Sequence, residues 1–145
     1  NVALAIRPSG AGDITESHVL WKQNRYLPYI PSLLHYRGCL FWVKRGGIVA
    51  SLDPGTGKTL KVGRVAGQSQ YFSSPVAADG KIYLLSEKGE LSVISAEPEW
   101  RQLSQADFKE DAYATPAIAG GRIYLRTTQY LYCFGLPVAR AGVQR

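Results

Sequence analysis

Apolar residues along the chain gather in short runs that are separated by turn residues. Two of the separators, Asp79-Gly80 and Gly120-Gly121, are tight-turn dipeptides, and each is flanked by apolar runs of strand length. No stretch keeps the roughly 3.6-residue apolar period of a helix over several turns. The pattern therefore predicts an all-β chain of short antiparallel strands.

The alternation of side chains indicates how these strands are covered. Ile82 and Leu84 point to one face of their strand, and Tyr83 and Leu85 point to the other. Since both faces are apolar, both must be buried, whereas a sheet with one wet face would alternate apolar and polar residues. Small sheets covered on both sides are typical of β-propeller blades stacked around an axis. A β-sandwich is the alternative, but it requires no repeat.

An internal repeat favours the propeller. The segment 74–84, with the sequence SPVAADGKIYL, aligns without a gap with 115–125, which reads TPAIAGGRIYL. A weaker copy lies at 32–42. The three copies are separated by 41 to 42 residues, a period that suits one four-stranded blade.

The repeat divides the chain into a half blade, two full blades and a partial blade. Strands expected at 2–6 and 18–22 resemble the third and fourth strands of a blade. The expected boundaries are a half blade at 1–24, blades at 29–66 and 72–108, a partial blade at 113–135 and a tail at 136–145. The sum is about three and a quarter blades, fewer than the roughly four to eight of a closed propeller. We therefore expect an incomplete ring whose partners are the remaining blades or a second copy of the chain.

Composition and charge narrow the class of protein. With 46% apolar and 19% charged residues among 145, the chain is globular rather than disordered. Cys39 and Cys133 form no CxxC or Cys/His cluster, which excludes zinc-finger and ferredoxin sites. The net charge of +6 is spread over single Lys and Arg residues, so nucleic-acid binding is not expected. No apolar run has the roughly 20 residues of a membrane span.

The repeated segments resemble the PQQ-like, or quinoprotein-type, β-propeller repeat, the family that includes alcohol-dehydrogenase quinoproteins and the BamB-like outer-membrane assembly lipoproteins. The resemblance is carried by 74–84, by 114–124 and by the turn at 53–58, DPGTGK. This turn is similar to the family's tryptophan-docking motif, A-x-D-x-x-T-G-K-x-x-W, in which the Trp locks neighbouring blades. The matching positions, expected to shape a structural turn, are Asp53, Thr56, Gly57 and Lys58.

Two positions depart from the docking motif. Ser51 stands where the family has Ala, and Lys61 stands where it has Trp. The resemblance therefore implies a weakened docking contact and a divergent branch without dehydrogenase activity.

The same resemblance frames an enzymatic alternative, a fragment of a PQQ-dependent quinoprotein oxidoreductase. Such enzymes hold PQQ with calcium in an eight-bladed ring, beside adjacent cysteines that form a vicinal disulfide. This chain has no adjacent cysteines and too few blades to enclose the cofactor alone. We therefore expect no cofactor, with PQQ and calcium only under the alternative. The resemblance also implies a periplasmic or otherwise extracytoplasmic location.

Residues suited to catalysis or metal binding are few. His18 and His35 are the only histidines, and their spacing offers no further metal ligands. The segment 57–59 lacks the first glycine of a P-loop, and no helical pattern follows it. Asp13 and Glu16 could pair as acid and base, although a solvated connector is the simpler interpretation. We expect neither a catalytic residue nor a metal site.

Propeller geometry supplies the candidate ligand residues. Loops before each first strand and turns between second and third strands fall on one face of such a fold. These loops hold aromatic and basic residues suited to acidic peptides or carbohydrates, namely Arg25, Tyr29, Lys44, Arg45, Tyr71, Lys88 and Tyr113. Packing between blades is the alternative role of the tyrosines. Arg126, inside an apolar strand, is expected to need a carboxylate or backbone partner, with a structural ion pair favoured over a ligand contact. The sequence thus predicts a non-catalytic binding or scaffolding module for protein or carbohydrate ligands.

Overall fold

The chain folds into short antiparallel strands, as the sequence predicts. The computed structural model describes residues 1–136, which form thirteen strands and no helix. The strands form four separate sheets, and each sheet is a meander in which neighbours in sequence are neighbours in space. This confirms the all-β, propeller-type architecture. In keeping with it, the described residues contain no helix that is long and apolar enough to cross a membrane.

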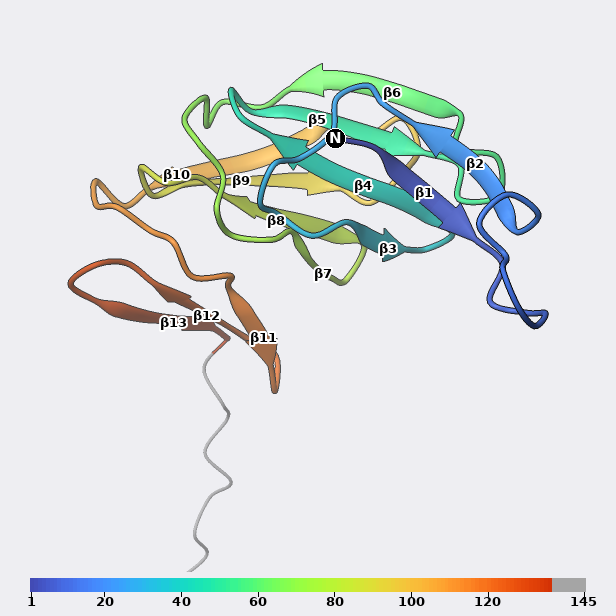
Figure 1. The fold of residues 1–145 in the computed structure, drawn as a ribbon. Coiled ribbons are helices and arrows are strands. Elements are labelled where there is room, and N and C mark those ends of the chain that lie inside the picture. Colours follow the sequence, from blue (N-terminus) through green and yellow to red (C-terminus); the bar gives the residue numbers. More distant parts are fainter. Residues whose placement is uncertain (137–145) are drawn as a thin grey trace, which may run out of the picture.

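Each sheet is a blade or part of one, and the blades are numbered here in chain order. The first blade contains β1 (Ala3–Ile6) and β2 (Val19–Gln23). The second contains β3 (Leu34–Tyr36), β4 (Cys39–Lys44), β5 (Ile48–Leu52) and β6 (Thr59–Arg64). The third contains β7 (Val76–Ala78), β8 (Lys81–Leu85), β9 (Glu90–Ser95) and β10 (Gln102–Asp107). The fourth contains β11 (Ala117–Ala119), β12 (Arg122–Arg126) and β13 (Leu131–Gly135). Figure 1 shows the blades following one another, with the first at one end and the fourth at the other.

The first blade has the register of the outer half of a full blade. Ala5 of β1 pairs with Trp21 of β2, and the register shifts by a bulge at the next residue. Ser51 of β5 pairs with Lys61 of β6, and an equivalent shift follows there. β1 and β2 therefore match β5 and β6 position by position, as third and fourth strands.

The core lies between the blades. Phe41 of the second blade and Ile82 of the third are both fully buried in one cluster, and Leu85 of the third blade packs with Leu125 of the fourth in another. Trp42, which points to the opposite side of β4 from Phe41, is buried in a third cluster on the side of the first blade. Alternate side chains of one strand thus bury themselves against two different neighbours, which is the reason that both faces are apolar.

The turns between first and second strands explain one of the repeat's strongest signals. Asp79 and Gly80 both have positive φ angles, 49° and 71°, as the hairpin between β7 and β8 requires. Glycine adopts this conformation without the steric cost that a Cβ imposes, and Asp tolerates it better than most residues. The DG dipeptide therefore fixes the register of this hairpin.

Backbone hydrogen bonds join consecutive blades at one end of the strands. The Gly46 N–H donates to the Ser69 carbonyl at 3.0 Å, and the Glu87 N–H donates to the Gln70 carbonyl at 2.8 Å. The Glu87 carbonyl in turn accepts the Ala112 N–H at 2.8 Å. We call this end the entry face, comprising the turns 44–47, 86–89 and 127–130 and the loops 24–33, 65–75 and 108–116. For the turns 44–47 and 86–89 and the loops 65–75 and 108–116, these hydrogen bonds confirm the prediction of a shared face.

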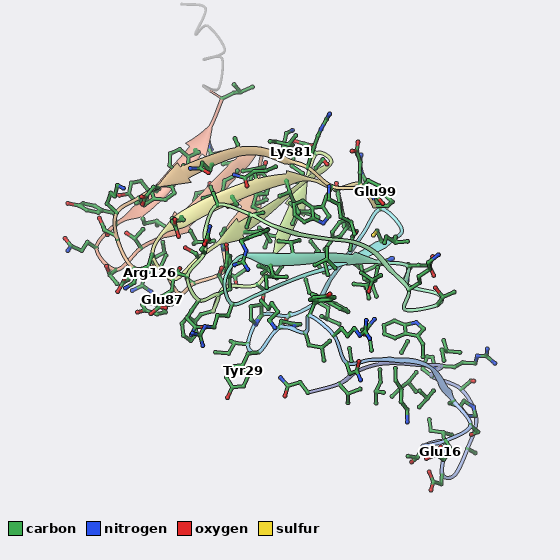
Figure 2. The ribbon with its side chains drawn as sticks, turned by 90° about the horizontal axis from the view of Figure 1, so that it is seen from above. Glu16, Tyr29, Lys81, Glu87, Glu99 and Arg126 are labelled. Carbon is green, nitrogen blue, oxygen red and sulfur yellow. The ribbon has the colours of Figure 1, made fainter. Side chains whose placement is uncertain are left out.

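Figure 2 shows the two ends of the blades. In this view Glu87 and Arg126 lie toward the same end of the blades, the entry face, whereas Lys81 and Glu99 lie toward the opposite end. The opposite end carries the turns between first and second strands, such as Asp79-Gly80.

Candidate binding face

All seven candidate ligand residues lie on the entry face, but they differ in exposure. Tyr29 is 86% exposed and Tyr113 is 49% exposed. Arg25, Arg45 and Lys88 are also exposed, and Lys44 is half-buried at the end of β4. The entry face therefore presents aromatic rings and cations to solvent.

Tyr71 is an exception, because the structure buries it. Its side chain is only 4% exposed, and its hydroxyl donates to the Gly67 carbonyl at 2.5 Å. Burial, with the nearby charge of Glu90, raises the pKa of Tyr71 well above its usual range. Tyr71 therefore packs between the second and third blades, and the expectation that it contacts a ligand is corrected to this structural role.

Lys88 and Tyr113 are both held by neighbouring side chains. The Lys88 ammonium lies 3.0 Å from an Asp111 carboxylate oxygen, and the pKa of Lys88 is raised by this hydrogen bond and charge. The Tyr113 ring packs at 5.5 Å, centroid to centroid, on the ring of Phe72. Partial desolvation, followed by the charges of Asp111 and Glu87, raises the pKa of Tyr113. These contacts fix Lys88 on the turn between β8 and β9 and Tyr113 on the loop between the third and fourth blades.

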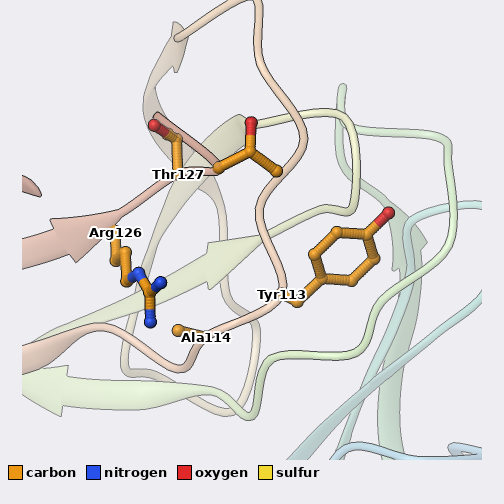
Figure 3. A pocket seen from close by; sticks show the side chains of 5 residues that line it. Tyr113, Ala114, Arg126 and Thr127 are labelled. Atoms are coloured by element: carbon orange, nitrogen blue, oxygen red, sulfur yellow. The ribbon is translucent and has the colours of Figure 1, made fainter. Parts of the chain in front are cut away.

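A cavity of about 450 Å³ opens beside Tyr113 on the fourth blade. Its other lining residues are Ala114, Arg126, Thr127 and Thr128, and Figure 3 shows Arg126 and Tyr113 on either side of Ala114. Arg126 is exposed and has no ion-pair partner among residues 1–136, contrary to the expectation of an ionic partner. The Thr127 hydroxyl is already engaged, since it lies 2.6 Å from a Glu110 carboxylate oxygen. Of these residues, the sequence pointed only to Tyr113 and, as an unusual charge, to Arg126.

The charge of the entry face is not uniform. A neighbouring cavity of about 480 Å³ is lined by both signs of charge: Lys88, Glu90, Asp107, Lys109, Glu110 and Asp111. A third cavity, of about 440 Å³ near the first and second blades, is lined mainly by apolar residues that include Leu27, Ile30 and Leu33. The entry-face cations without an ion pair among residues 1–136 are therefore Arg25 on the loop before the second blade, Lys44 and Arg45 on the second blade, and Arg126 on the fourth.

The predicted structural turn forms at the far end of the second blade. One carboxylate oxygen of Asp53 accepts both the backbone N–H and the hydroxyl of Thr56, at 2.8 and 2.7 Å. These hydrogen bonds lower the pKa of Asp53. Gly57 has a φ of 71°, and a Cβ there would come within 2.5 Å of the Trp21 ring. The exposed Lys58 closes the turn, because its carbonyl accepts the Asp53 N–H at 2.9 Å. The turn is therefore the seat for Trp21, whose indole N–H donates to Pro54 at 2.9 Å.

The junction between the second and third blades has an equivalent contact, but here the tryptophan comes from the later blade instead of the earlier one. Lys61, which replaces the motif's Trp, lies with its ammonium 4.9 Å from the Trp100 ring centroid and 2.6 Å from the Trp100 carbonyl. Ser51, which replaces the Ala, donates its hydroxyl to the Pro98 carbonyl at 2.5 Å. A Cβ on Gly63 would lie 2.8 Å from the Trp100 ring. The two departures therefore do not remove the junction, because the third blade supplies a tryptophan to it; that the contact is weaker than the family's stays a prediction.

Sequence reasoning missed the role of Trp21, although a signal was present. Asp13 precedes Trp21 by eight positions, as Asp53 precedes Lys61. The Asp13 carboxylate accepts the Thr15 N–H at 2.9 Å, which is a similar turn, and this contact lowers the pKa of Asp13. Asp13 is therefore a turn residue of the first blade, as Asp53 is of the second.

The described residues offer little for catalysis. His35 is exposed, and the contact of His18 is a 2.7 Å hydrogen bond between its Nδ1 and the exposed Ser17 hydroxyl. Among residues 1–136 no carboxylate forms a hydrogen bond with the other ring nitrogen of His18, so the Ser17–His18 pair lacks the third group of a triad. No group of three or more His, Cys, Asp or Glu in the described part of the chain could hold a metal ion.

Comparison with known proteins supports the fold. No family model and no curated protein matches the chain. Among solved structures, BamB from Moraxella catarrhalis is similar with a TM-score of 0.57 and 16% identity over 79% of this chain and 33% of that one. A europium-containing methanol dehydrogenase has a TM-score of 0.55 and 15% identity over 73% and 21%. The computationally designed Ika4 protein has a TM-score of 0.67 and 13% identity over 86% and 77%.

These similarities establish the fold and show how much of each similar protein the chain corresponds to. BamB and the methanol dehydrogenase are PQQ-like β-propeller proteins, so the resemblance seen in the sequence is confirmed at the level of the fold. The chain spans about a third of the length of the first protein and about a fifth of the second.

Proposed function

We propose that this stack of propeller blades is a non-catalytic binding module whose entry face takes protein or carbohydrate ligands that carry acidic groups. One observation carries the proposal: the entry face exposes the Tyr29 ring, and it also exposes second-blade cations such as Arg45 that form no ion pair with residues 1–136. The propeller fold, shared with BamB, is consistent with protein contacts and with a location outside the cytoplasm.

Aromatic and basic side chains suit such a ligand for separate reasons. A tyrosine ring contributes a large contact area at a small entropic cost, and aromatic and Arg residues dominate the binding energy of many interfaces. An Arg side chain pairs with a carboxylate through two parallel hydrogen bonds. The second-blade part of the face is favoured because Lys44 and Arg45 form no ion pair with residues 1–136, whereas Lys88 is already paired with Asp111.

Binding to a panel of immobilised acidic peptides and acidic oligosaccharides tests the proposal. We expect Tyr29→Ala and Arg45→Ala each to weaken binding by roughly five- to thirtyfold, which corresponds to about 1–2 kcal/mol for an anchor residue. Lys81→Ala removes a cation at the opposite end of the blades and serves as the matched control, with affinity unchanged within about twofold.

Two results would count against the proposal. One is the absence of saturable binding to every acidic member of the panel by a folded chain. The other is an equal loss of affinity in Lys81→Ala and Arg45→Ala, because this would indicate net charge rather than a defined face.

A further inference from the structure

The face that each blade turns toward its successor is built from the same four positions. Two lie on the second strand and two lie opposite them on the third. In the second blade they are Phe41, Val43, Val49 and Ser51; in the third, Tyr83, Leu85, Leu91 and Val93; in the fourth, Tyr124, Arg126, Leu131 and Cys133.

The first two sets are covered and the last is not. Phe41 and Val43 are buried by the third blade, and Leu85 is buried by the fourth. On the fourth blade Leu131 is 70% exposed, and Arg126 is exposed at the position that Val43 and Leu85 occupy in the covered blades. The fourth blade thus presents the same kind of surface that the second and third blades bury against their successors. One position of that surface, aliphatic in the covered blades, is a cation here.

The third blade, which is covered by the fourth, shows which residues pack over the position equivalent to Arg126, next to the entry face. Ala112 is buried there in one cluster with Leu85 and Leu91, and its N–H donates to the Glu87 carbonyl at 2.8 Å. The preceding residue, Asp111, pairs with Lys88 of the same turn at 3.0 Å. We call the space beside Leu85 and the Glu87 carbonyl the slot of the third blade. It is covered by residues 111–113, which are in order an acidic, a small and an aromatic residue.

The fourth blade repeats this arrangement up to the covering segment. The Thr128 N–H donates to the Asp111 backbone carbonyl at 2.9 Å, just as the Glu87 N–H donates to the Gln70 backbone carbonyl at 2.8 Å. Thr128 is therefore the counterpart of Glu87. The Thr128 carbonyl accepts no backbone hydrogen bond from residues 1–136. The cavity of about 450 Å³ lined by Arg126 and Thr128 is thus the slot that Ala112 fills one blade earlier.

We propose that this slot binds an extended acidic peptide segment of a partner protein, in the way that residues 111–113 cover the third blade. A small residue of the segment lies in the slot and donates its N–H to the Thr128 carbonyl. A carboxylate of the segment pairs with Arg126, because covering an unpaired guanidinium would cost more than the contact gains. The proposal rests on the proposed function, for which it names the class of partner and a second contact site.

The chain itself supplies the probe. A blocked peptide with the sequence of residues 109–115, KEDAYAT, contains the covering segment and is titrated calorimetrically into the whole chain. We expect saturable binding with one site. Arg126→Leu restores the residue type of the covered blade, so the fold is retained, and it should weaken binding at least fivefold.

Two altered peptides complete the test. A peptide with Gln and Asn in place of its two acidic residues should lose the dependence on Arg126, binding the wild type and Arg126→Leu equally within about twofold. A peptide with Pro in place of the central Ala should fail to bind, because proline has no N–H to donate to the Thr128 carbonyl. Absence of saturable binding by the folded wild type, or unchanged affinity in Arg126→Leu, overturns the proposal.

Arg45→Ala separates this proposal from the proposed function. Affinity for KEDAYAT should stay within about twofold in this variant, because Arg45 lies on the second blade. If acidic ligands depend on Arg45 and Tyr29 but not on Arg126, the slot proposal fails and the proposed function stands. If the affinity for KEDAYAT depends on Arg126 but the affinity for every panel ligand is independent of Arg45 and Tyr29, the slot proposal is supported. The proposed ligand contacts of Tyr29 and Arg45 are then refuted.

Discussion

Replacing Lys61 by Met tests whether the junction between the second and third blades depends on the charged group that stands in for a tryptophan. The Lys61 ammonium donates to the Trp100 carbonyl at 2.6 Å and lies 4.9 Å from the ring centroid of the same residue. Methionine keeps an unbranched stem over the ring and removes only the charge and the donor. The substitution therefore isolates the polar part of the contact.

The expected cost follows from the two interactions that are lost. A hydrogen bond from a charged group contributes about 1.5–3 kcal/mol, and a cation–π contact at a partly exposed site contributes about 0.5–1 kcal/mol. Lys61 is half-buried, so the lower ends apply, and a sulfur–aromatic contact of about 0.3–1.5 kcal/mol offsets part of the loss. The net destabilisation should be about 1 kcal/mol, whereas Trp100→Ala, which empties a site only 3% exposed, should cost about 3–5 kcal/mol.

Urea unfolding followed by far-UV circular dichroism measures both values. Lys58→Met makes the same chemical change on the exposed turn nearby and should stay within about 0.5 kcal/mol of the wild type. In Lys61→Met/Trp100→Ala the cost of losing Lys61 should vanish, because its partner is gone. If Lys61→Met is indistinguishable from Lys58→Met, the reasoning that Lys61 replaces the docking tryptophan is refuted.

Three further predictions concern other parts of the fold. Gly57→Ala should destabilise by roughly 2 kcal/mol or more in the same unfolding assay, since a Cβ would meet the Trp21 ring at 2.5 Å in a positive-φ conformation; a neutral effect would contradict the seat described for Trp21. One thiol should react with a disulfide reagent in the native chain and two in denaturant, because burial raises the pKa of Cys39 while Cys133 is exposed; two fast native reactions would contradict this. Burial raises the pKa of Tyr71, so the unfolded chain releases that proton first and stability should fall as pH rises above about 10, a slope that Tyr71→Phe should flatten in pH-dependent urea titrations.

The strands, their order and the shared entry face could be predicted because local signals agree with the fold. The DG and GG dipeptides set two hairpins, and the apolar residues on both sides of β8 required a neighbour on each face. The matching period of the copies then placed equivalent loops at one end. These features depend on residues close in sequence, so a sequence pattern carries them.

The individual contacts could not be predicted, because they depend on residues far apart in the chain. Tyr29 and Tyr71 both precede a first strand, but only Tyr71 is buried, beneath the hydrogen bonds between neighbouring loops. Lys61 contacts Trp100, which lies 39 positions away in the next blade. The slot beside Arg126 likewise appears only when the fourth blade is compared with the covered third blade in three dimensions.

Amide chemical-shift mapping of the whole labelled chain with its tightest acidic panel ligand tests most directly whether the entry face is the binding surface. We expect the shifted amides to cluster in the turns 44–47, 86–89 and 127–130 and in the loops that adjoin them. Shifts clustered instead at the opposite end, around 53–58, 79–80 and 97–100, would contradict the assignment of function to the entry face.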